Sequence, residues 1–261
     1  MLEVLDRGPR SASDKPPILF VHGAWHGAWC WDEHFLDYFA EKGYRSVALS
    51  LRGHGDSTAP KSMRLCSIAD FVDDIDTVAK SLPEPPVVIG HSLGGFVVQK
   101  YLESHDAPAA VLLASVPVSG ITGFLLRRFQ RHPWYTATAL ARMRSLRCVG
   151  GTPELARETF FSQLTPEADV LRYTALLGEE YALKISIDAL WLNLPRPNLV
   201  TTPLLILGAD DDECFTKQEV RSTAMAYKTD AEFFPNMSHD MMLDPGWTTV
   251  AERIFDWLEK R

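Results

Sequence analysis

Short runs of apolar residues recur along this chain and alternate with longer segments in which apolar residues follow helical spacing. A continuous apolar run bounded by turn residues is typical of a strand that is buried on both faces of a sheet. Such runs predict strands at residues 17–21, 45–50, 87–89, 110–114, 203–207 and 231–234, with residues 2–5 as a possible edge strand. Strands that alternate with helices predict an α/β protein with a mostly parallel central sheet and helices on both faces.

Four helices are predicted around these strands. Residues 32–42 form one that ends at Gly43, because glycine readily adopts the left-handed conformation found just beyond many helix ends. A second opens with a capping box from Ser67 to Asp70 and carries its apolar residues on one stripe, which would pack against the sheet. The third spans residues 93–105, and the last spans residues 250–258.

Residues 118–197 interrupt the alternation, because they show helical patterns but no convincing strand. So long an excursion between two strands is not an ordinary loop. We expect an inserted helical cap over the carboxyl edge of the sheet, where active sites of such sheets lie. The predicted core domain then comprises residues 1–117 and 198–261.

The most specific motif is Gly90-His91-Ser92-Leu93-Gly94, which directly follows the apolar run 87–89 and precedes a helical segment. A serine at the tip of a sharp strand-to-helix turn is typical of a nucleophile elbow. The turn holds the serine in a strained backbone conformation, and the flanking glycines leave room for it. Ser92 is therefore the candidate nucleophile.

A serine hydroxyl is a weak nucleophile at neutral pH and needs a base within hydrogen-bond reach, a role that suits histidine. Among eight histidines, His239 follows the last predicted strand and precedes the final helix. We expect three histidines in glycine-containing motifs to shape turns or to line a pocket: His22, His54 and His91. An acidic run at residues 210–213 offers a carboxylate that could orient the imidazole.

His22-Gly23, Gly53-His54-Gly55, the turn around Ser92, the acidic run and His239 together resemble the α/β-hydrolase fold superfamily of serine esterases and lipases. The resemblance extends over nearly the whole chain outside residues 118–197. It implies that Ser92 attacks a carbonyl carbon, that His239 transfers the proton, and that a carboxylate orients His239.

The same resemblance suggests two further assignments. Asp212 is the predicted acid, because Asp-x-x-Phe-Thr is similar to the Asp-x-x-apolar-Pro pattern of the family, and Asp211 is the alternative. The motif His22-Gly23-Ala24 resembles the oxyanion loop of the family, which implies the backbone amides of Ala24 and Leu93 as oxyanion-hole donors.

The segment HGAWHGAW at residues 22–29 is similar to the plant methyl-esterase and hydroxynitrile-lyase branch, and to many bacterial hydrolases. The chain departs from the lyases because no lysine adjoins the acidic run, and Lys217 lies beyond Thr216. It also departs from haloalkane dehalogenases and epoxide hydrolases, which carry aspartate in place of Ser92.

Three further residues are candidates for substrate binding. Trp25 and His26 follow the oxyanion loop and could reach the mouth of the pocket. Met241 is close to His239 and could line an adaptable apolar site, although core packing explains it equally well.

The first half of the predicted cap contains no acidic residue between Val118 and Pro153. Its arginines form either a solvated cationic face or a surface for anionic substrate groups or an anionic lipid surface. They are Arg127, Arg128, Arg131, Arg142, Arg144 and Arg147.

Net charge, the length of apolar runs and the spacing of cysteines argue against several classes of function. A formal net charge of −8 over 261 residues argues against nucleic-acid binding, and the chain has no apolar run long enough for a membrane span. Its start lacks the basic and apolar regions of a secretory leader, so we expect a cytoplasmic location. The scattered cysteines lack metal-ligand spacing and are predicted to be free buried thiols: Cys30, Cys66, Cys148 and Cys214.

The sequence therefore predicts a serine hydrolase that cleaves a small to medium carboxylic ester through an acyl-enzyme, with no metal or organic cofactor. Two alternatives stay open. One is a cofactor-free lyase or carbon–carbon bond hydrolase that uses the same residues. The other is a receptor-like protein that binds a ligand with negligible turnover. The sequence does not predict the oligomeric state.

Overall fold

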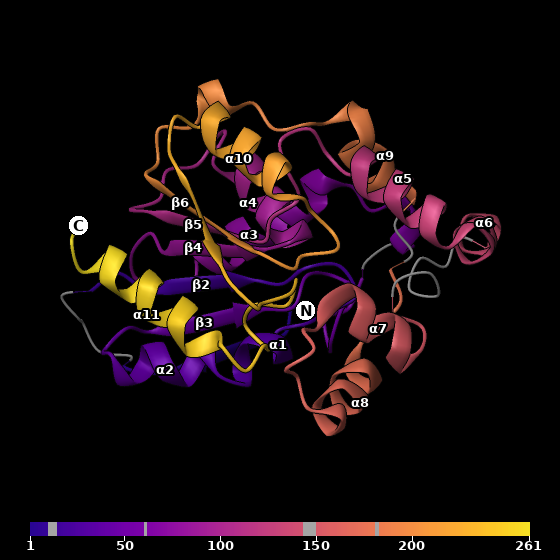
Figure 1. The fold of residues 1–261 in the computed structure, drawn as a ribbon. Coiled ribbons are helices and arrows are strands. Elements are labelled where there is room, and N and C mark those ends of the chain that lie inside the picture. Colours follow the sequence, from indigo (N-terminus) through magenta and orange to yellow (C-terminus); the bar gives the residue numbers. More distant parts are fainter. Residues whose placement is uncertain (10–14, 60–61, 143–149, 181–182) are drawn as a thin grey trace.

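A computed structural model describes residues 1–9, 15–59, 62–142, 150–180 and 183–261. In these residues the strands form a seven-stranded sheet with the order β1-β3-β2-β4-β5-β6-β7 (Figure 1). The strands are β1 (Val4–Arg7), β2 (Ile18–Val21), β3 (Ser46–Leu49), β4 (Val87–His91), β5 (Ala110–Leu113), β6 (Leu204–Ala209) and β7 (Ala231–Phe234). The β1–β3 pair is antiparallel and the five other neighbouring pairs are parallel, which confirms the predicted class.

The burial of the strands explains why their sequences are continuous apolar runs. Every residue of the five inner strands, β2 to β6, is buried, whereas the edge strands β1 and β7 are partly exposed. The edge strand expected at residues 2–5 begins two residues later, at Val4. Because β4, β6 and β7 run parallel, the loops that follow them meet at one edge of the sheet.

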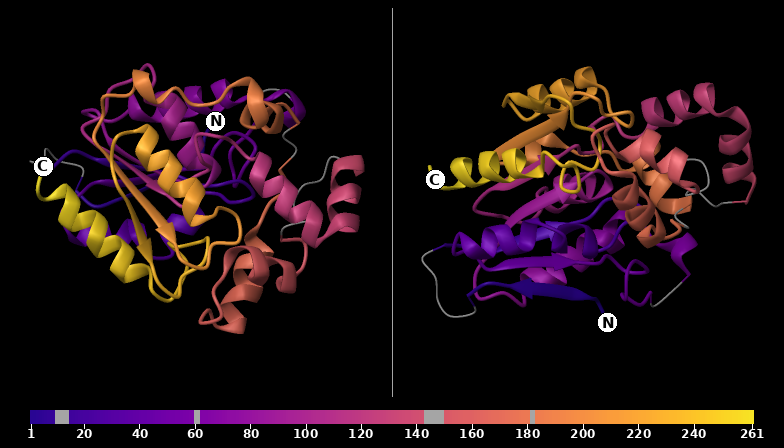
Figure 2. Two further views of the ribbon diagram at one scale, coloured as in Figure 1. Left: turned by 45° about the horizontal axis from the view of Figure 1, so that its top comes forward. Right: turned by 60° about the horizontal axis from the view of Figure 1, so that its bottom comes forward.

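Helices cover both faces of this sheet (Figures 1 and 2). On one face α2 (Phe35–Glu41) packs against α11 (Trp247–Leu258). On the other face lie α3 (Ile68–Ala79), α4 (Leu93–Tyr101) and α10 (Lys217–Ala226), with α3 packed against α4. The predicted helices are therefore present, and the capping box of α3 forms between Ser67 and Asp70.

Three helix boundaries differ from the prediction. The helix expected at residues 32–42 is divided into α1 (Trp29–Asp32) and α2, because His34 leaves the helical conformation with φ −146°. Helix α4 ends at Tyr101 rather than at residue 105, and turns follow it. Helix α11 starts three residues before the expected Val250.

Residues 118–197, called the inserted segment below, connect β5 to β6 and contain helices but no strand within their described part. The helices are α5 (Thr122–Arg131), α6 (Pro133–Arg142), α7 (Pro153–Phe160), α8 (Glu167–Leu176), α9 (Leu183–Ile187) and the π-helical turn η3 (Asp188–Leu192), and the 3₁₀ turn η4 (Pro197–Leu199) follows. Two backbone hydrogen bonds join this segment to core loops. The Gly178 amide donates to the Trp25 carbonyl, and the Asp240 amide donates to the Phe160 carbonyl.

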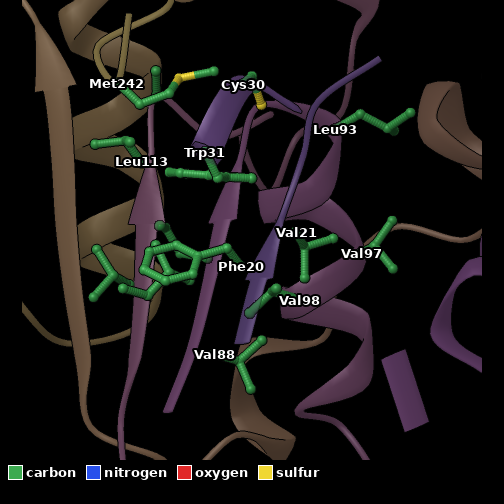
Figure 3. Packing of buried hydrophobic residues seen from close by; sticks show 14 of the residues in the cluster. Phe20, Val21, Cys30, Trp31, Val88, Leu93, Val97, Val98, Leu113 and Met242 are labelled. Carbon is green, nitrogen blue, oxygen red and sulfur yellow. The ribbon is translucent and has the colours of Figure 1, made fainter. Parts of the chain in front are cut away.

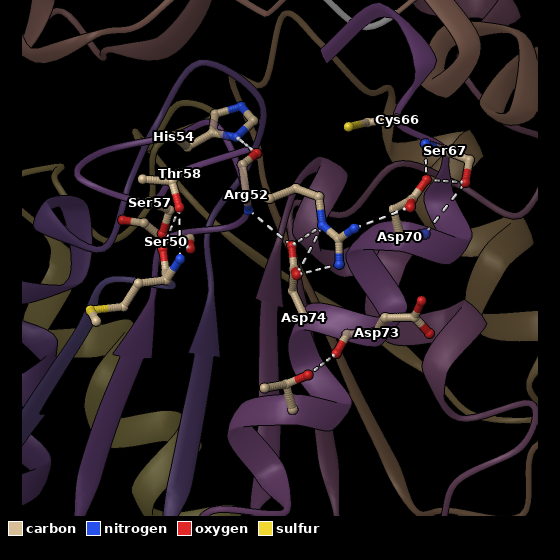
Figure 4. A network of polar contacts seen from close by, with 12 residues as sticks. Ser50, Arg52, His54, Ser57, Thr58, Cys66, Ser67, Asp70, Asp73 and Asp74 are labelled. Carbon is tan, nitrogen blue, oxygen red and sulfur yellow. Dashed lines mark hydrogen bonds and ion pairs between the residues drawn. The ribbon is translucent and has the colours of Figure 1, made fainter. Parts of the chain in front are cut away.

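The turn that follows β3 is anchored to α3 by an arginine (Figure 4). The Arg52 guanidinium forms ion pairs with Asp70 at 3.1 Å and Asp74 at 2.6 Å. Another 3₁₀ turn, η1 (Met63–Leu65), lies just before this helix. The Arg52 carbonyl is 3.2 Å from Nδ1 of His54, so the same network positions the His54 ring.

The core is dense with aromatic and branched side chains (Figure 3). Phe20 and Trp31 are fully buried, with ring centroids 5.0 Å apart, so Trp31 is a core residue. Trp29 stacks on Tyr173 of α8 and thereby helps to join the inserted segment to the sheet.

The prediction of free buried thiols is confirmed for Cys30, Cys66 and Cys214, and Cys148 lies outside the described residues. None of the described helices combines the length and the apolar character that crossing a membrane would require.

Candidate active site

Ser92 lies in the turn between β4 and α4 with φ 51° and ψ −118°, a conformation that non-glycine residues rarely adopt. Such strain costs on the order of 1–3 kcal/mol and persists only where the surroundings hold it. Here the Ser92 amide donates to the Leu113 carbonyl at 3.1 Å, and the Ser92 carbonyl accepts from the Val116 amide at 3.0 Å. A Cβ at Gly90 would lie 2.6 Å from the Gly94 carbonyl oxygen, so the turn requires a residue without a side chain there.

His239 follows β7, and its ring meets the carboxylate of Asp212, which follows β6. Nδ1 of His239 is 3.0 Å from each carboxylate oxygen of Asp212. Asp212 Oδ1 also accepts hydrogen bonds from the amides of Cys214 at 2.7 Å and Phe215 at 3.1 Å, so the turn itself orients the carboxylate. Asp211 is exposed. The structure therefore brings Asp212, and not Asp211, to His239.

Two opposing effects set the charge of His239. Burial disfavours the imidazolium, whereas the contacts with Asp212 and then Cys214 favour it, and together they raise the pKa of His239 well above 6.5. Burial also raises the pKa of the neighbouring Cys214 thiol, which keeps it protonated. An ionised carboxylate can only accept, so Nδ1 carries the hydrogen and Nε2 remains for proton transfer.

Ser92 and His239 approach the same region from different loops. The His91 ring lies 4.8 Å from the His239 ring, measured between centroids, and His91 Nε2 donates to the His239 carbonyl at 3.1 Å. Phe215, whose ring is 5.5 Å from that of His239, lines the same cavity as Ser92. Among the described side chains no hydrogen bond joins the Ser92 hydroxyl to the His239 ring, so that contact stays a prediction.

Neutral histidines support the loops around Ser92. Burial, and then the proximity of His239, lowers the pKa of His91 to about 3. Burial, followed by the nearby His54, also lowers the pKa of His22 well below 6.5. His22 Nε2 accepts from the Leu51 amide at 3.0 Å, so Nδ1 carries the hydrogen and donates to the Gly23 carbonyl at 2.7 Å. These rings shape turns, as expected.

A cavity of about 100 Å³ lies beside Ser92. Both predicted oxyanion-hole residues, Ala24 and Leu93, contribute to its wall. Leu93 is the first residue of α4, where amides lack intrahelical partners and the helix dipole favours negative charge. The rest of the wall is mostly apolar. Half of all the lining residues come from the inserted segment, including Ile121, Phe124, Leu125, Glu180, Ile185 and Ala189.

Only one of the three predicted pocket residues reaches this cavity. Trp25 lines it, in a left-handed conformation with φ 66°. The prediction was wrong for His26, because the loop turns its ring inward onto Asp240, with Nε2 2.9 Å from Oδ2. Met241 is fully buried and absent from the cavity wall, as its core-packing alternative expected, because the chain turns back into the core after Asp240.

Sequence reasoning missed several residues of this region. Asp240 is fully buried, and although burial disfavours its charge, the nearby His26 ring lowers its pKa below 3.8. Its position next to His239 was the available signal. Cys214 and Phe215 directly follow the acidic run, which could have marked them as wall residues. Nothing in the sequence marks Glu180.

We expect His26→Ala to destabilise the fold by about 3–5 kcal/mol, because it leaves the buried Asp240 carboxylate without its ring partner. Urea unfolding, followed by circular dichroism, measures the loss. The double variant His26→Ala/Asp240→Asn serves as the control and should lose less than the two single variants together. Strict additivity, or a loss below about 1 kcal/mol for His26→Ala, would contradict this role.

Among the described residues, two groups of side chains are close enough together to hold a metal ion, namely His91 with His239 and Asp240, and His239 with Asp212 and Cys214. Both groups need His239, whose Nδ1 is already bonded to Asp212. The second also needs a thiolate, which the raised pKa of Cys214 disfavours. The geometry is better suited to proton transfer than to metal binding.

The cationic face predicted for the inserted segment is neutralised in the part that the structure describes. Arg127 pairs with Glu219, Arg128 with Glu158, and Arg131 with Glu213. The side chain of Arg142, together with Arg144 and Arg147, lies outside the described residues. Lys217 pairs with Asp210 at 2.8 Å and is absent from the cavity wall, unlike the lysine expected of a lyase.

A mostly parallel sheet with a strained serine after β4 and a carboxylate–histidine pair after β6 and β7 is typical of an α/β protein of the hydrolase class. Residues 18–251 match the model of the alpha/beta hydrolase family, and the chain belongs to that family.

Similar proteins share only part of their sequence with this chain. Protein phosphatase methylesterase 1 of Bos taurus is 32% identical over 113 residues, which is 42% of this chain and 30% of that protein. Non-heme chloroperoxidase of Burkholderia pyrrocinia is 33% identical over 123 residues, 47% of this chain and 42% of that protein. The chain thus spans less than half the length of these curated relatives.

Similarity in structure extends over nearly the whole chain. A thermophilic esterase from Thermogutta terrifontis has a TM-score of 0.77 at 18% identity, covering 99% of this chain and 93% of its own. The putative non-heme bromoperoxidase BpoC of Mycobacterium tuberculosis has a TM-score of 0.74 at 19% identity, covering 99% and 96%. At these identities the likeness establishes the fold alone.

Proposed function

We propose that this hydrolase cleaves a small carboxylic ester through an acyl-enzyme on Ser92. The observation that carries the proposal is a cavity lined by a strained serine and two candidate amide donors, with a carboxylate–histidine pair that packs against Phe215 of its wall. Methylesterases among the proteins similar in sequence support the same chemistry.

The proposed reaction has two halves. In the first, Ser92 Oγ attacks the ester carbonyl carbon while its proton moves to Nε2 of His239, and the amides of Ala24 and Leu93 stabilise the oxyanion. Collapse of this intermediate breaks the carbon–oxygen bond, and the departing alcohol takes the proton from His239. In the second half, water gives a proton to His239 and attacks the acyl carbon. Collapse of this second intermediate breaks the bond to Ser92 Oγ, which takes the proton back from His239 as the acid is released.

Asp212 has an orienting role in this scheme. Its carboxylate accepts the Nδ1 hydrogen of His239, which directs Nε2 toward the serine and stabilises the imidazolium during each transfer. The hydrogen bonds that Asp212 accepts from the amides of Cys214 and Phe215 hold its carboxylate in this position before the substrate binds.

We further propose that the inserted segment serves as the cap of the active site. Its residues supply half of the cavity wall, and its backbone bonds to the loops of Trp25 and Asp240 hold it beside Ser92. An apolar wall of this kind favours substrates with an apolar portion.

We expect a marked preference for short acyl chains, because the cavity of about 100 Å³ is smaller than an engineered cavity of about 150 Å³ that accepts benzene. A pH-stat assay of methyl acetate, butyrate, octanoate and laurate tests this. The value of kcat/KM should be highest for methyl acetate or methyl butyrate. It should be at least ~10-fold lower for methyl laurate, because the longer acyl chain does not fit into a small, rigid pocket. A rise toward laurate would contradict the proposed pocket.

Hydrolysis of methyl butyrate by the purified chain is the direct test of the proposed function. We expect catalytic turnover with release of methanol and butyrate in equal amounts. Absence of turnover across the whole ester series, with the protein folded, would overturn the proposal.

A further inference from the structure

The turn that bears Asp212 is bonded to an arginine of the inserted segment. Arg127, from α5, donates from Nη2 to the Cys214 carbonyl at 2.6 Å. The amide of the same Cys214 residue donates to the Asp212 carboxylate at 2.7 Å. Cys214 therefore connects the Arg127 guanidinium, through its own backbone, to the carboxylate that contacts His239.

The guanidinium is in turn held by Glu219 of α10. Arg127 Nη1 donates to Glu219 Oε1 at 3.1 Å, and Nη2 donates to Oε2 at 2.9 Å. Two parallel bonds of this kind fix the plane of a guanidinium as well as its position. Glu219 also accepts from the amide and the hydroxyl of Thr216, in the capping box that begins α10. Arg127 is thus anchored to a helix start and directed at the Cys214 carbonyl.

Helix α5 leaves space for this contact at Gly123, one turn before Arg127. A Cβ at Gly123 would overlap Glu219 Oε1 and would lie 3.0 Å from Arg127 Nη1. Glycine is among the least favourable residues within a helix. Its presence at this position therefore fits the close approach of α5 to the carboxylate of Glu219.

Arg131 lies one turn further along α5 and contacts the same loop in a different way. It pairs with the side chains of Glu213 at 2.6 Å and Glu158 at 3.1 Å, and about half of its own side chain is exposed. Exposed ion pairs between side chains contribute little to stability. Arg131 therefore provides a comparison for Arg127, which bonds to the backbone of the turn.

The position of the turn matters because of what it carries. Asp212 and His239 are both buried, and the carboxylate is directed by the amides of Cys214 and Phe215. These amides can direct it only while the turn keeps its place. A displacement of about 1 Å in a catalytic group can cost on the order of 100-fold in rate.

We propose that Arg127 is a positioning residue, which holds the turn of residues 212–215 so that Asp212 remains directed at His239. The inserted segment then supports the catalytic acid in addition to the cavity wall. This inference rests on the proposed function for its meaning in catalysis. The bond between Asp212 and His239 is itself a structural property, and it can be measured without turnover.

The first test observes that bond directly. Proton NMR detects the Nδ1 hydrogen of a buried histidine that is bonded to a carboxylate as a signal far downfield, and loss of this signal in Asp212→Asn assigns it to His239. In Arg127→Gln we expect the signal to move upfield and to exchange faster with water, because the carboxylate is no longer held in place. Arg131→Gln is the matched control, since it removes the same charge from the same helix, and it should leave the signal unchanged.

The second test separates positioning of Asp212 from general support of the fold. In Arg127→Gln, kcat for methyl butyrate should fall about 10- to 100-fold, as expected for a displaced catalytic group. The same substitution in the Asp212→Asn background should lower kcat less than about 2-fold, because the carboxylate that Arg127 positions is already absent. A residue that supported only the cavity wall would lower kcat in both backgrounds.

A lysine variant keeps the tests open if Arg127→Gln is too unstable to study. Arg127→Lys retains the charge but lacks the second parallel bond of the guanidinium. We expect a loss of kcat between that of the unaltered protein and that of Arg127→Gln, and an intermediate shift of the His239 signal.

Three results would overturn the inference. These are an unchanged His239 signal in Arg127→Gln, an equal change in Arg131→Gln, or a loss of kcat that is undiminished in the Asp212→Asn background. The two proposals also remain distinguishable. A shifted His239 signal in a protein without any turnover would sink the proposed function alone, whereas turnover that is insensitive to Arg127→Gln would sink this inference alone.

Discussion

Ser92→Ala should lower kcat for methyl butyrate by about 10⁶-fold, the order of loss found when a serine nucleophile is removed from a complete triad. Alanine removes only the hydroxyl, and both residues carry the same strain at φ 51°. The turn is held by backbone bonds to Leu113 and Val116, which the substitution leaves in place. Circular dichroism and the melting temperature should therefore remain those of the unaltered protein.

A matched control lies at the opposite end of the same helix. Ser104 follows α4, far along the helix from Ser92, so Ser104→Ala should leave kcat unchanged. A Ser92→Ala protein that is folded and retains more than about a hundredth of the activity would show that another group performs the attack, since the oxyanion hole alone supplies far less.

Asp212→Asn should lower kcat by about 10⁴-fold, because an amide in place of the carboxylate leaves His239 in the wrong tautomer. The carboxylate oxygens both lie 3.0 Å from Nδ1, and only an acceptor there keeps the hydrogen on Nδ1. Steady-state kinetics with methyl butyrate measures the loss. Asp211→Asn is the control, since its exposed side chain should tolerate the change. The reverse pattern would mean that Asp211 is the acid.

The pH profile provides a second readout of Asp212. The general base must be neutral, so activity should fall as pH drops through the pKa of His239, which Asp212 raises above 6.5. Removing the negative charge lowers that pKa, so the acid limb of kcat/KM should move to lower pH in Asp212→Asn. An acid limb that does not move in Asp212→Asn would show that Asp212 does not set the pKa of the titrating group.

Features that depend on neighbouring residues in the sequence were predictable. The strand, turn and helix around Ser92 are contiguous, and the small residues that the turn requires are visible at Gly90 and Gly94. The continuous apolar runs likewise predicted the inner strands, because those strands are buried on both faces.

Features that depend on the direction of a turn were not predictable. Trp25 and His26 are adjacent, yet the positive φ of Trp25 directs one ring into the cavity and the other onto Asp240. The choice of Asp212 over Asp211 needed a family pattern, because only turn geometry separates the two. Glu180 is far from Ser92 in sequence, and only the packing of the inserted segment brings it to the cavity.

The central claim is that Ser92 is a nucleophile activated by His239. Intact-protein mass spectrometry after incubation with a fluorophosphonate probe tests it most directly. The account predicts one adduct per chain, mapped to Ser92 by peptide analysis, lost in Ser92→Ala and formed far more slowly in His239→Ala. An unlabelled folded protein, or an adduct that persists in Ser92→Ala, would contradict it.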